Sequence, residues 1–208
     1  MANFDSTIYE LSLETAYLPT SLPAGAGTTL AQTLPRWMCS TATAFTSGHW
    51  VAVALYLPAR TIVQGFTAFS SGTALATGTH QWMALFDLNL AKLCTSSDDT
   101  NVAWGTHTAK RLPVSFDSAG GAITEFKTTY SGVYYAGLGI AASTMPTISG
   151  MAGSGGALRS QQPYFCILDT SSGVTAVPAS LVQTATSNGS ATVPYIVLDG
   201  RLPSPTNP

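Results

Sequence analysis

Histidines are the first residues in this sequence to consider for chemistry. His49, His80 and His107 each fall at a strand edge or in a loop. None has a second histidine or a carboxylate at the spacing that a metal site requires. A catalytic histidine needs a partner for its proton, and the sequence shows none, so we expect these histidines to lie at the surface or in turns.

The only pair of adjacent acids is Asp98-Asp99, in the polar run from Ser96 to Asn101. Carboxylates are hard oxygen ligands, so this pair could hold Ca²⁺ in a loop, but an ordinary polar turn is the favoured interpretation. Hydrolysis of a glycan would require two carboxylates flanking a cleft, and no spacing in the chain selects such a pair. We therefore assign no catalytic residue and no metal ligand.

The cysteines and glycines form no recognised motif. Cys39, Cys94 and Cys166 are far apart and make no C-x-x-C pair. We expect small buried side chains in a reducing cytoplasm rather than a zinc site or disulfides. The run Gly150 to Gly156 lacks the lysine and the following helix of a phosphate-binding loop, so it predicts a flexible loop, and no cofactor is expected.

Aromatic side chains are the remaining candidates for binding, because their rings can stack on sugars. The candidates are Trp37, Trp50, Trp82, Trp104, Tyr134 and Tyr135. Trp50 and Trp82 lie within apolar stretches and are expected in the core. Trp104 lies in a polar loop and is the candidate glycan contact. The alternative for Trp104 is a ring that caps the end of a sandwich.

The composition excludes several classes of protein. Only 9% of the 208 residues are charged and the net charge is -2, whereas soluble domains usually contain about 25% charged residues. Without a basic excess the chain is not expected to bind nucleic acid. The longest apolar run, Trp50 to Leu57, is far shorter than the roughly 20 residues of a membrane span, so no membrane insertion is expected. The 45% of hydrophobic residues can bury a core, which argues against disorder.

The elements that must position these residues are predicted to be strands. Apolar alternation and turn signals predict short strands at the following positions: Trp50–Leu57, Thr61–Phe69, Trp82–Phe86, Leu90–Cys94, Ala109–Phe116, Ile123–Phe126, Tyr130–Ala142, Tyr164–Leu168, Leu181–Thr186 and Tyr195–Leu198. Loops are predicted at Ser70–Thr79, Thr95–Thr108 and Met145–Gly156. Many short strands separated by turns are typical of an all-β fold, an antiparallel, jelly-roll-like β-sandwich.

Three regions are expected along the chain. Residues 1–48 are punctuated by prolines and rich in Gly, Ser and Thr, which predicts an extended N-terminal arm. Residues 49–199 contain the strands of the sandwich domain, and residues 200–208 form a Pro-rich C-terminal tail. An extended arm suits a subunit that lies across a neighbour in a larger assembly.

Four stretches within residues 49–150 resemble β-sandwich virion proteins of tailed phages that infect actinobacteria. These stretches are WVAVALYLPARTIVQGFTAFSSGTA, HQWMALFDLNLAKLCTSSDDTNVAW, HTAKRL and YSGVYYAGLGIAASTMPTISG. The resemblance covers about half of the chain. It implies a minor tail protein or a capsid-surface protein and does not decide between them.

The sequence and the resemblance together lead to one favoured function and two alternatives. The favoured one is a non-enzymatic virion structural protein, made in the host cytoplasm, that docks through its N-terminal arm. Its expected partners are other virion proteins and copies of itself, with a trimer as one arrangement. The alternatives are a capsid decoration or head-fibre protein, and a carbohydrate-binding module for a host cell-surface glycan. A cell-wall hydrolase is the least favoured class.

Overall fold

The computed structural model describes residues 26–41, 46–152, 163–171, 173–182 and 192–202. Within these residues the chain forms strands and one short 3-10 helix, η1 (Arg36–Met38). The strands are β1 (Thr28–Gln32), β2 (Ser40–Thr41), β3 (His49–Leu57), β4 (Ile62–Phe69), β5 (Ala76–Phe86), β6 (Lys92–Ser96), β7 (Ala109–Asp117), β8 (Phe126–Lys127), β9 (Gly132–Thr144), β10 (Ser149–Ala152), β11 (Cys166–Asp169), β12 (Thr192–Pro194) and β13 (Ile196–Arg201).

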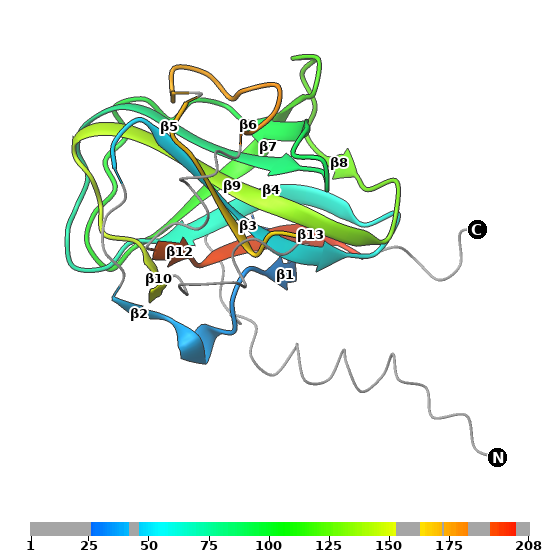
Figure 1. Cartoon of the computed structure of the whole chain (residues 1–208), viewed down its shortest axis with the longest axis horizontal. Helices are drawn as coiled ribbons and strands as arrows, with labels where there is room; N and C mark the ends of the chain where they lie inside the picture. Colours follow the sequence, from blue (N-terminus) through cyan, green and yellow to red (C-terminus); the bar gives the residue numbers. More distant parts are fainter. Residues whose placement is uncertain (1–25, 42–45, 153–162, 172, 183–191, 203–208) are drawn as a thin grey trace.

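The strands form one large sheet that folds over into two layers (Figure 1). The strand order is β1-β13-β4-β7-β6-β5-β9-β3-β11, with β8 also paired to β4. One layer contains β1, β13, β4 and β7, the other contains β6, β5, β9, β3 and β11, and the β6–β7 pairing joins them. Every strand pair is antiparallel, so the predicted all-β antiparallel sandwich is confirmed. A small sheet, β12-β10-β2, lies beside it.

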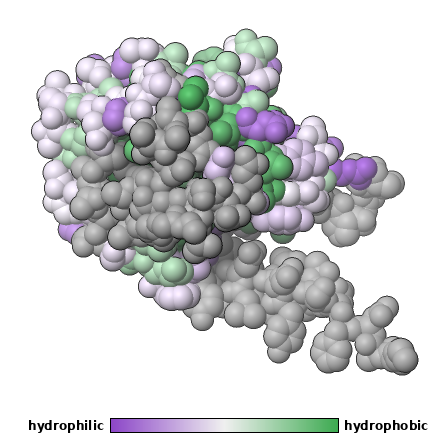
Figure 2. Space-filling model, viewed as in Figure 1, coloured by the Kyte–Doolittle hydropathy of each residue, from purple (hydrophilic) through white to green (hydrophobic). Residues whose placement is uncertain are grey.

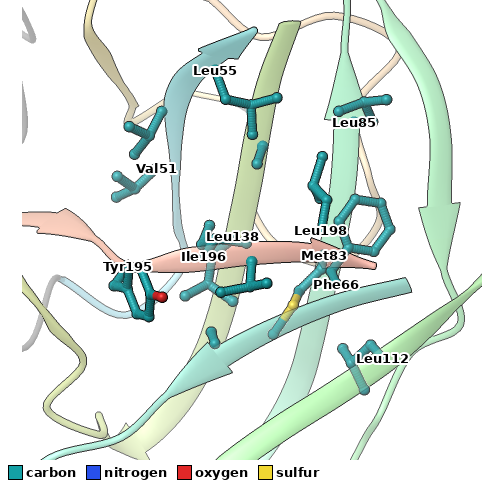
Figure 3. Packing of buried hydrophobic residues seen from close by; sticks show 14 of the residues in the cluster. Val51, Leu55, Phe66, Met83, Leu85, Leu112, Leu138, Tyr195, Ile196 and Leu198 are labelled. Atoms are coloured by element: carbon teal, nitrogen blue, oxygen red, sulfur yellow. The ribbon is translucent and has the colours of Figure 1, made fainter. Parts of the chain in front are cut away.

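The main core lies between the two layers. Figure 3 shows β13 and β4 crossing β3, β9 and β5, with Phe66, Met83, Leu138 and Leu198 packed between them. Along β3 the residues alternate as the sequence predicts, because successive side chains of a strand point to opposite faces. The side chains of Val51 and its alternate neighbours enter this core.

A second apolar layer covers the other face of β3, β5, β9 and β11. It is built on Trp50, Phe86 and Tyr135, all fully buried, and is covered by Val174 and Leu181. The indole of Trp50 meets the Phe86 ring edge-on, with centroids 6.2 Å apart. Burial on both faces explains why β3 and β9 are apolar at nearly every position.

The surface is polar without being strongly charged. On the face shown in Figure 2 most described residues are pale, with isolated purple residues and one green group of hydrophobic residues beside the grey atoms. This pattern agrees with a sequence that has 9% charged residues.

Part of the expected N-terminal arm belongs to the sandwich. Within residues 1–48, strand β1 pairs with β13, and Leu30 and Leu34 are buried in the main core. The alternation is weak here because β1 is a short edge strand with a register shift. Residues 1–25 and 42–45 of the arm lie outside the described residues. At the other end β13 continues to Arg201, so the predicted tail begins inside a strand, and residues 203–208 are not described.

All three loop predictions and two strand predictions were wrong in part of the described chain. Thr95–Ser96, expected in a loop, ends β6, and of Ile123–Phe126, expected to lead into a strand, only Phe126 lies in one. Ala76–Thr79, expected in a loop, begins β5. Ser149–Ala152, expected in the Gly-rich loop, is β10. Gly150 is needed there because a Cβ atom would collide with the main chain of Val193 in β12, which a sequence cannot reveal. Leu181 and Val182 form no strand, and residues 183–186 and 153–156 of these predictions lie outside the description.

Candidate functional site

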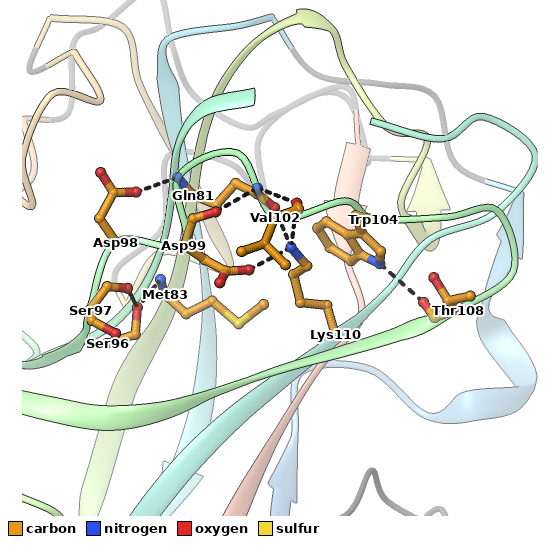
Figure 4. Close-up of polar contacts among 10 residues, drawn as sticks. All are labelled: Gln81, Met83, Ser96, Ser97, Asp98, Asp99, Val102, Trp104, Thr108 and Lys110. Atoms are coloured by element: carbon orange, nitrogen blue, oxygen red, sulfur yellow. Dashed lines mark hydrogen bonds and ion pairs between the residues drawn. The ribbon is translucent and has the colours of Figure 1, made fainter. Parts of the chain in front are cut away.

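The loop between β6 and β7 brings several of the sequence candidates together (Figure 4). Asp98 lies against β5, where its Oδ2 atom is 2.6 Å from Nδ1 of His80 and its Oδ1 atom accepts a hydrogen bond from the Gln81 amide at 2.9 Å. Partial burial raises the pKa of the Asp98 carboxyl, but the hydrogen bonds from Gln81 and His80 outweigh burial and lower the pKa below its ordinary value of 3.8. Asp98 therefore fastens the start of this loop to β5.

Asp99 points to a different partner, the buried amine of Lys110 on β7. Lys110 is 8% exposed. Its Nζ atom donates to Asp99 Oδ2 at 2.6 Å, to Gln81 Oε1 at 2.8 Å and to the Val102 carbonyl at 3.1 Å. An ammonium has three protons to donate, so all three have acceptors. The ammonium also lies 5.7 Å from the ring centroid of Trp104, within range of a cation–π contact.

Gln81 completes this cluster from β5. Its side chain is 1% exposed, and its Nε2 atom donates to the main-chain carbonyls of Asp99 at 2.9 Å and Val102 at 3.0 Å. We call Gln81, Asp99 and Lys110 the amide cluster. The sequence singled out Asp99 but not its two partners, because Gln81 and Lys110 come from strands separated along the chain and only the fold brings them together.

Trp104 does not have the open ring that the predicted glycan contact needs. It is 2% exposed, its Nε1 atom donates to the Thr108 carbonyl at 3.1 Å, and its carbonyl accepts from the Leu75 amide. An aromatic ring stacks on a sugar only if one face is accessible. Trp104 instead belongs to the main core, as the alternative of a capping ring requires, and we do not propose a glycan contact there.

The histidines and the remaining candidates are spread over the fold. His49 is half-buried at the start of β3, and exposed His107 adopts a left-handed backbone with φ of 52°. Cys94 and Cys166 are buried, as predicted, whereas Cys39 is partly exposed. In the part of the chain that the structure describes, His, Cys, Asp and Glu side chains form no group of three or more that could hold a metal ion. None of the described helices is long and apolar enough to cross a membrane.

Each described carboxylate accepts hydrogen bonds within the fold. Asp87 and Asp117 accept main-chain amides in tight turns. Asp169 is fully buried and accepts hydrogen bonds from the amides of Ser171 and Val182. It therefore holds the segment that covers the second apolar layer. The other four, Asp98, Asp99, Glu125 and Asp199, form ion pairs with basic side chains.

The most exposed large hydrophobic side chain of the described residues is an aromatic residue that the sequence analysis did not single out. Trp37, in η1 between β1 and β2, is 70% exposed, and its neighbour Met38 is 37% exposed. We call Arg36–Met38 the Trp37 turn, and Figure 1 shows it at the lower margin of the molecule, away from the core. The available signal was a tryptophan and a methionine next to Pro35, in a stretch without the alternation that would bury them.

Comparison of the chain with protein-family models, curated proteins and solved structures finds no match.

Proposed function

We propose that this chain is a non-enzymatic structural protein of a tailed-phage virion, most simply a minor tail protein on the particle exterior. Its role is to attach to other virion proteins or to copies of itself through its N-terminal region. Capsid decoration is the second placement of the same kind of protein. The resemblance of residues 49–150 to virion β-sandwich proteins supports the proposal, and it does not separate tail from capsid.

The observation that carries the proposal is the Trp37 turn. An exposed tryptophan next to an exposed methionine leaves apolar area in water, and Trp is among the residues that most often dominate binding energy at protein interfaces. The turn directly follows β1, the strand that joins the N-terminal region to the sandwich. A partner that binds the N-terminal region therefore has an apolar anchor within reach.

The polar groups support attachment over catalysis. The described carboxylates are occupied by turns, ion pairs and main-chain amides. In these roles the described carboxylates hold turns, loops and strands of the fold together. A fold whose few charges hold its own loops in place suits a protein that presents surfaces to neighbours.

Incorporation into particles tests this proposal. We would produce virions carrying either a chain that begins at residue 26 or the double variant Trp37→Ala/Met38→Ala, then purify them and quantify the protein by mass spectrometry. The truncation stops before β1, because removal of residues 28–32 would also remove an edge strand. We expect both variants to fold, as judged by circular dichroism, and to be absent from particles or strongly depleted.

The matched control is Tyr56→Ala. Tyr56 is 62% exposed on β3, so it tests the loss of an exposed aromatic elsewhere on the molecule, and this variant should be incorporated normally. Normal incorporation of both N-terminal variants would show that the attachment site is elsewhere. Absence of the unaltered protein from purified particles would rule out a virion protein altogether.

A further inference from the structure

The amide cluster holds an amine, a carboxamide and a carboxylate in contact inside the protein. Lys110 Nζ lies 2.8 Å from Gln81 Oε1 and 2.6 Å from Asp99 Oδ2. Lys110 is 8% and Gln81 1% exposed, while the side chain of Asp99 is 22% exposed. These three groups contain everything needed to exchange one amide for another.

We propose that Lys110 and Gln81 join spontaneously in an isopeptide bond, with Asp99 carrying the protons. The proposal goes beyond the attachment function and does not depend on it. It concerns the chemistry of this cluster alone, and it requires no oxidant, cofactor or second protein.

The reaction balances within the cluster. The Lys110 ammonium gives a proton to the Asp99 carboxylate, and the resulting neutral amine attacks Cδ of Gln81. The Nζ–Cδ bond forms and the Cδ–Nε2 bond breaks. Two protons pass from Nζ by way of Asp99 to Nε2, which leaves as ammonium, and Asp99 returns to its carboxylate form. The charge of one ammonium on Lys110 is replaced by the charge of one ammonium ion released to solvent.

The contacts among the three groups support this exchange, because Lys110 Nζ already touches both the Gln81 carboxamide and the Asp99 carboxylate. Reacting groups held in contact avoid the entropic cost of meeting, which raises rates by many orders of magnitude in well-oriented systems. To attack, Lys110 Nζ gives up its hydrogen bond to Gln81 Oε1 and moves to Cδ, the carbon bonded to that oxygen. The Asp99 carbonyl holds the departing Nε2 atom at 2.9 Å, which places the carboxyl of the same residue within a side chain's reach of the leaving group.

Water is largely kept away from the cluster, as amide exchange requires if hydrolysis is not to compete. Trp104, 2% exposed, lies over the Lys110 ammonium. The product bond would link β5 to β7, two strands separated by β6 in the sheet. A covalent link between them would resist unfolding, because a cross-link restricts the unfolded chain.

Intact-mass spectrometry of the purified full-length chain tests the proposal directly. We expect a mass lower than that of the sequence by one ammonia, and a branched peptide that joins Lys110 to Gln81 after proteolysis. Asp99→Asn keeps the size of the side chain and removes the proton carrier, so this variant should have the mass of its unlinked sequence. Lys127→Arg alters an exposed lysine and should retain the loss of ammonia.

The measurement on the unaltered chain decides the matter even if a variant fails to fold. A full, unlinked mass after prolonged incubation of the folded protein would overturn the proposal. So would the loss of one water, which would indicate a bond between Lys110 and Asp99 instead. Loss of ammonia confined to the peptide that contains Asn188-Gly189 would also overturn it, because that change is cyclisation of an asparagine.

Discussion

The ion pair between Arg111 and Asp199 should be among the most costly polar contacts to break. Asp199 on β13 is fully buried, and Arg111 on β7 has a side chain 13% exposed. Arg111 donates from Nε to Oδ1 at 2.9 Å and from Nη2 to Oδ2 at 2.7 Å. The pair reaches across β4 at Gly65, where a Cβ atom would lie 2.6 Å from Arg111 Nη2. Asp199 also accepts the Gly27 amide just before β1.

Arg111→Met removes the cation and retains much of the aliphatic chain. The carboxylate of Asp199 is then buried with only the Gly27 amide as a described partner, and removing one member of a buried pair typically costs about 3–5 kcal/mol. This is a large part of the roughly 5–15 kcal/mol that stabilises a typical domain. Urea unfolding followed by circular dichroism would measure the loss.

Arg201→Met is the matched control. Arg201 contacts Glu125 at 2.6 Å, but the two side chains are 59% and 40% exposed. An exposed pair contributes about 0–1 kcal/mol, so the same substitution here should be nearly neutral. Equal losses for the two variants would refute the reasoning, because it attributes the difference to burial alone. The double variant Arg111→Met/Asp199→Asn should recover part of the loss, since it removes the unpaired charge.

Three further predictions concern tryptophan burial, glycine packing and pH. Trp104→Ala should lower the free energy of unfolding by about 3–5 kcal/mol, as large core truncations do. Trp37→Ala should change it by no more than about 0.5 kcal/mol. Urea unfolding measures both losses, and the reverse order would mean that the two burial assignments are wrong. Gly139→Ala places a Cβ atom 2.6 Å from the indole ring of Trp50 in the second apolar layer and should lower the free energy of unfolding by about 1–3 kcal/mol. Gly72→Ala is the control, because a Cβ atom there has nothing within 4 Å, and its loss in the same urea experiment should be far smaller. Partial burial raises the pKa of Asp98, but its hydrogen bonds lower the pKa more, to below the ordinary value of 3.8. The charged carboxylate therefore stabilises the fold above pH 3.8, and this contribution is lost as the pH falls through the lowered pKa. The stability advantage of the unaltered chain over Asp98→Asn should therefore shrink as the pH falls below 3.8, and an advantage that grows on acidification would contradict this assignment.

Strand positions were the most predictable part of the fold. Trp50 to Leu57 and Tyr130 to Ala142 are long, apolar and β-branched or aromatic, and they appear as β3 and β9 with small shifts at their ends. The local pattern is enough to predict these strands because each side chain of a strand points to one of only two faces. The pattern fails for Ser149–Ala152, which is a strand because it pairs with β12 and β2, segments distant in the chain.

The candidate site was much less predictable. The sequence drew attention to Trp104 as the accessible aromatic, but the structure buries it and exposes Trp37. Both lie in stretches without alternation, so no local signal separates them. Exposure depends on which distant segments pack around a side chain, and the fold places Trp104 in the main core with the Lys110 ammonium 5.7 Å from its ring centroid.

An all-β sandwich with few charges, and with buried cysteines at positions 94 and 166, can be predicted from the amino-acid sequence. These properties follow from composition and from period-two alternation, which are local. The folded arrangement, in contrast, turns Asp98 and Asp99 to different partners and brings Lys110 to Gln81 inside the protein. Burying a polar or charged group is costly unless the fold supplies its hydrogen-bonding partners, and for Lys110 those partners come from segments that are distant in the chain.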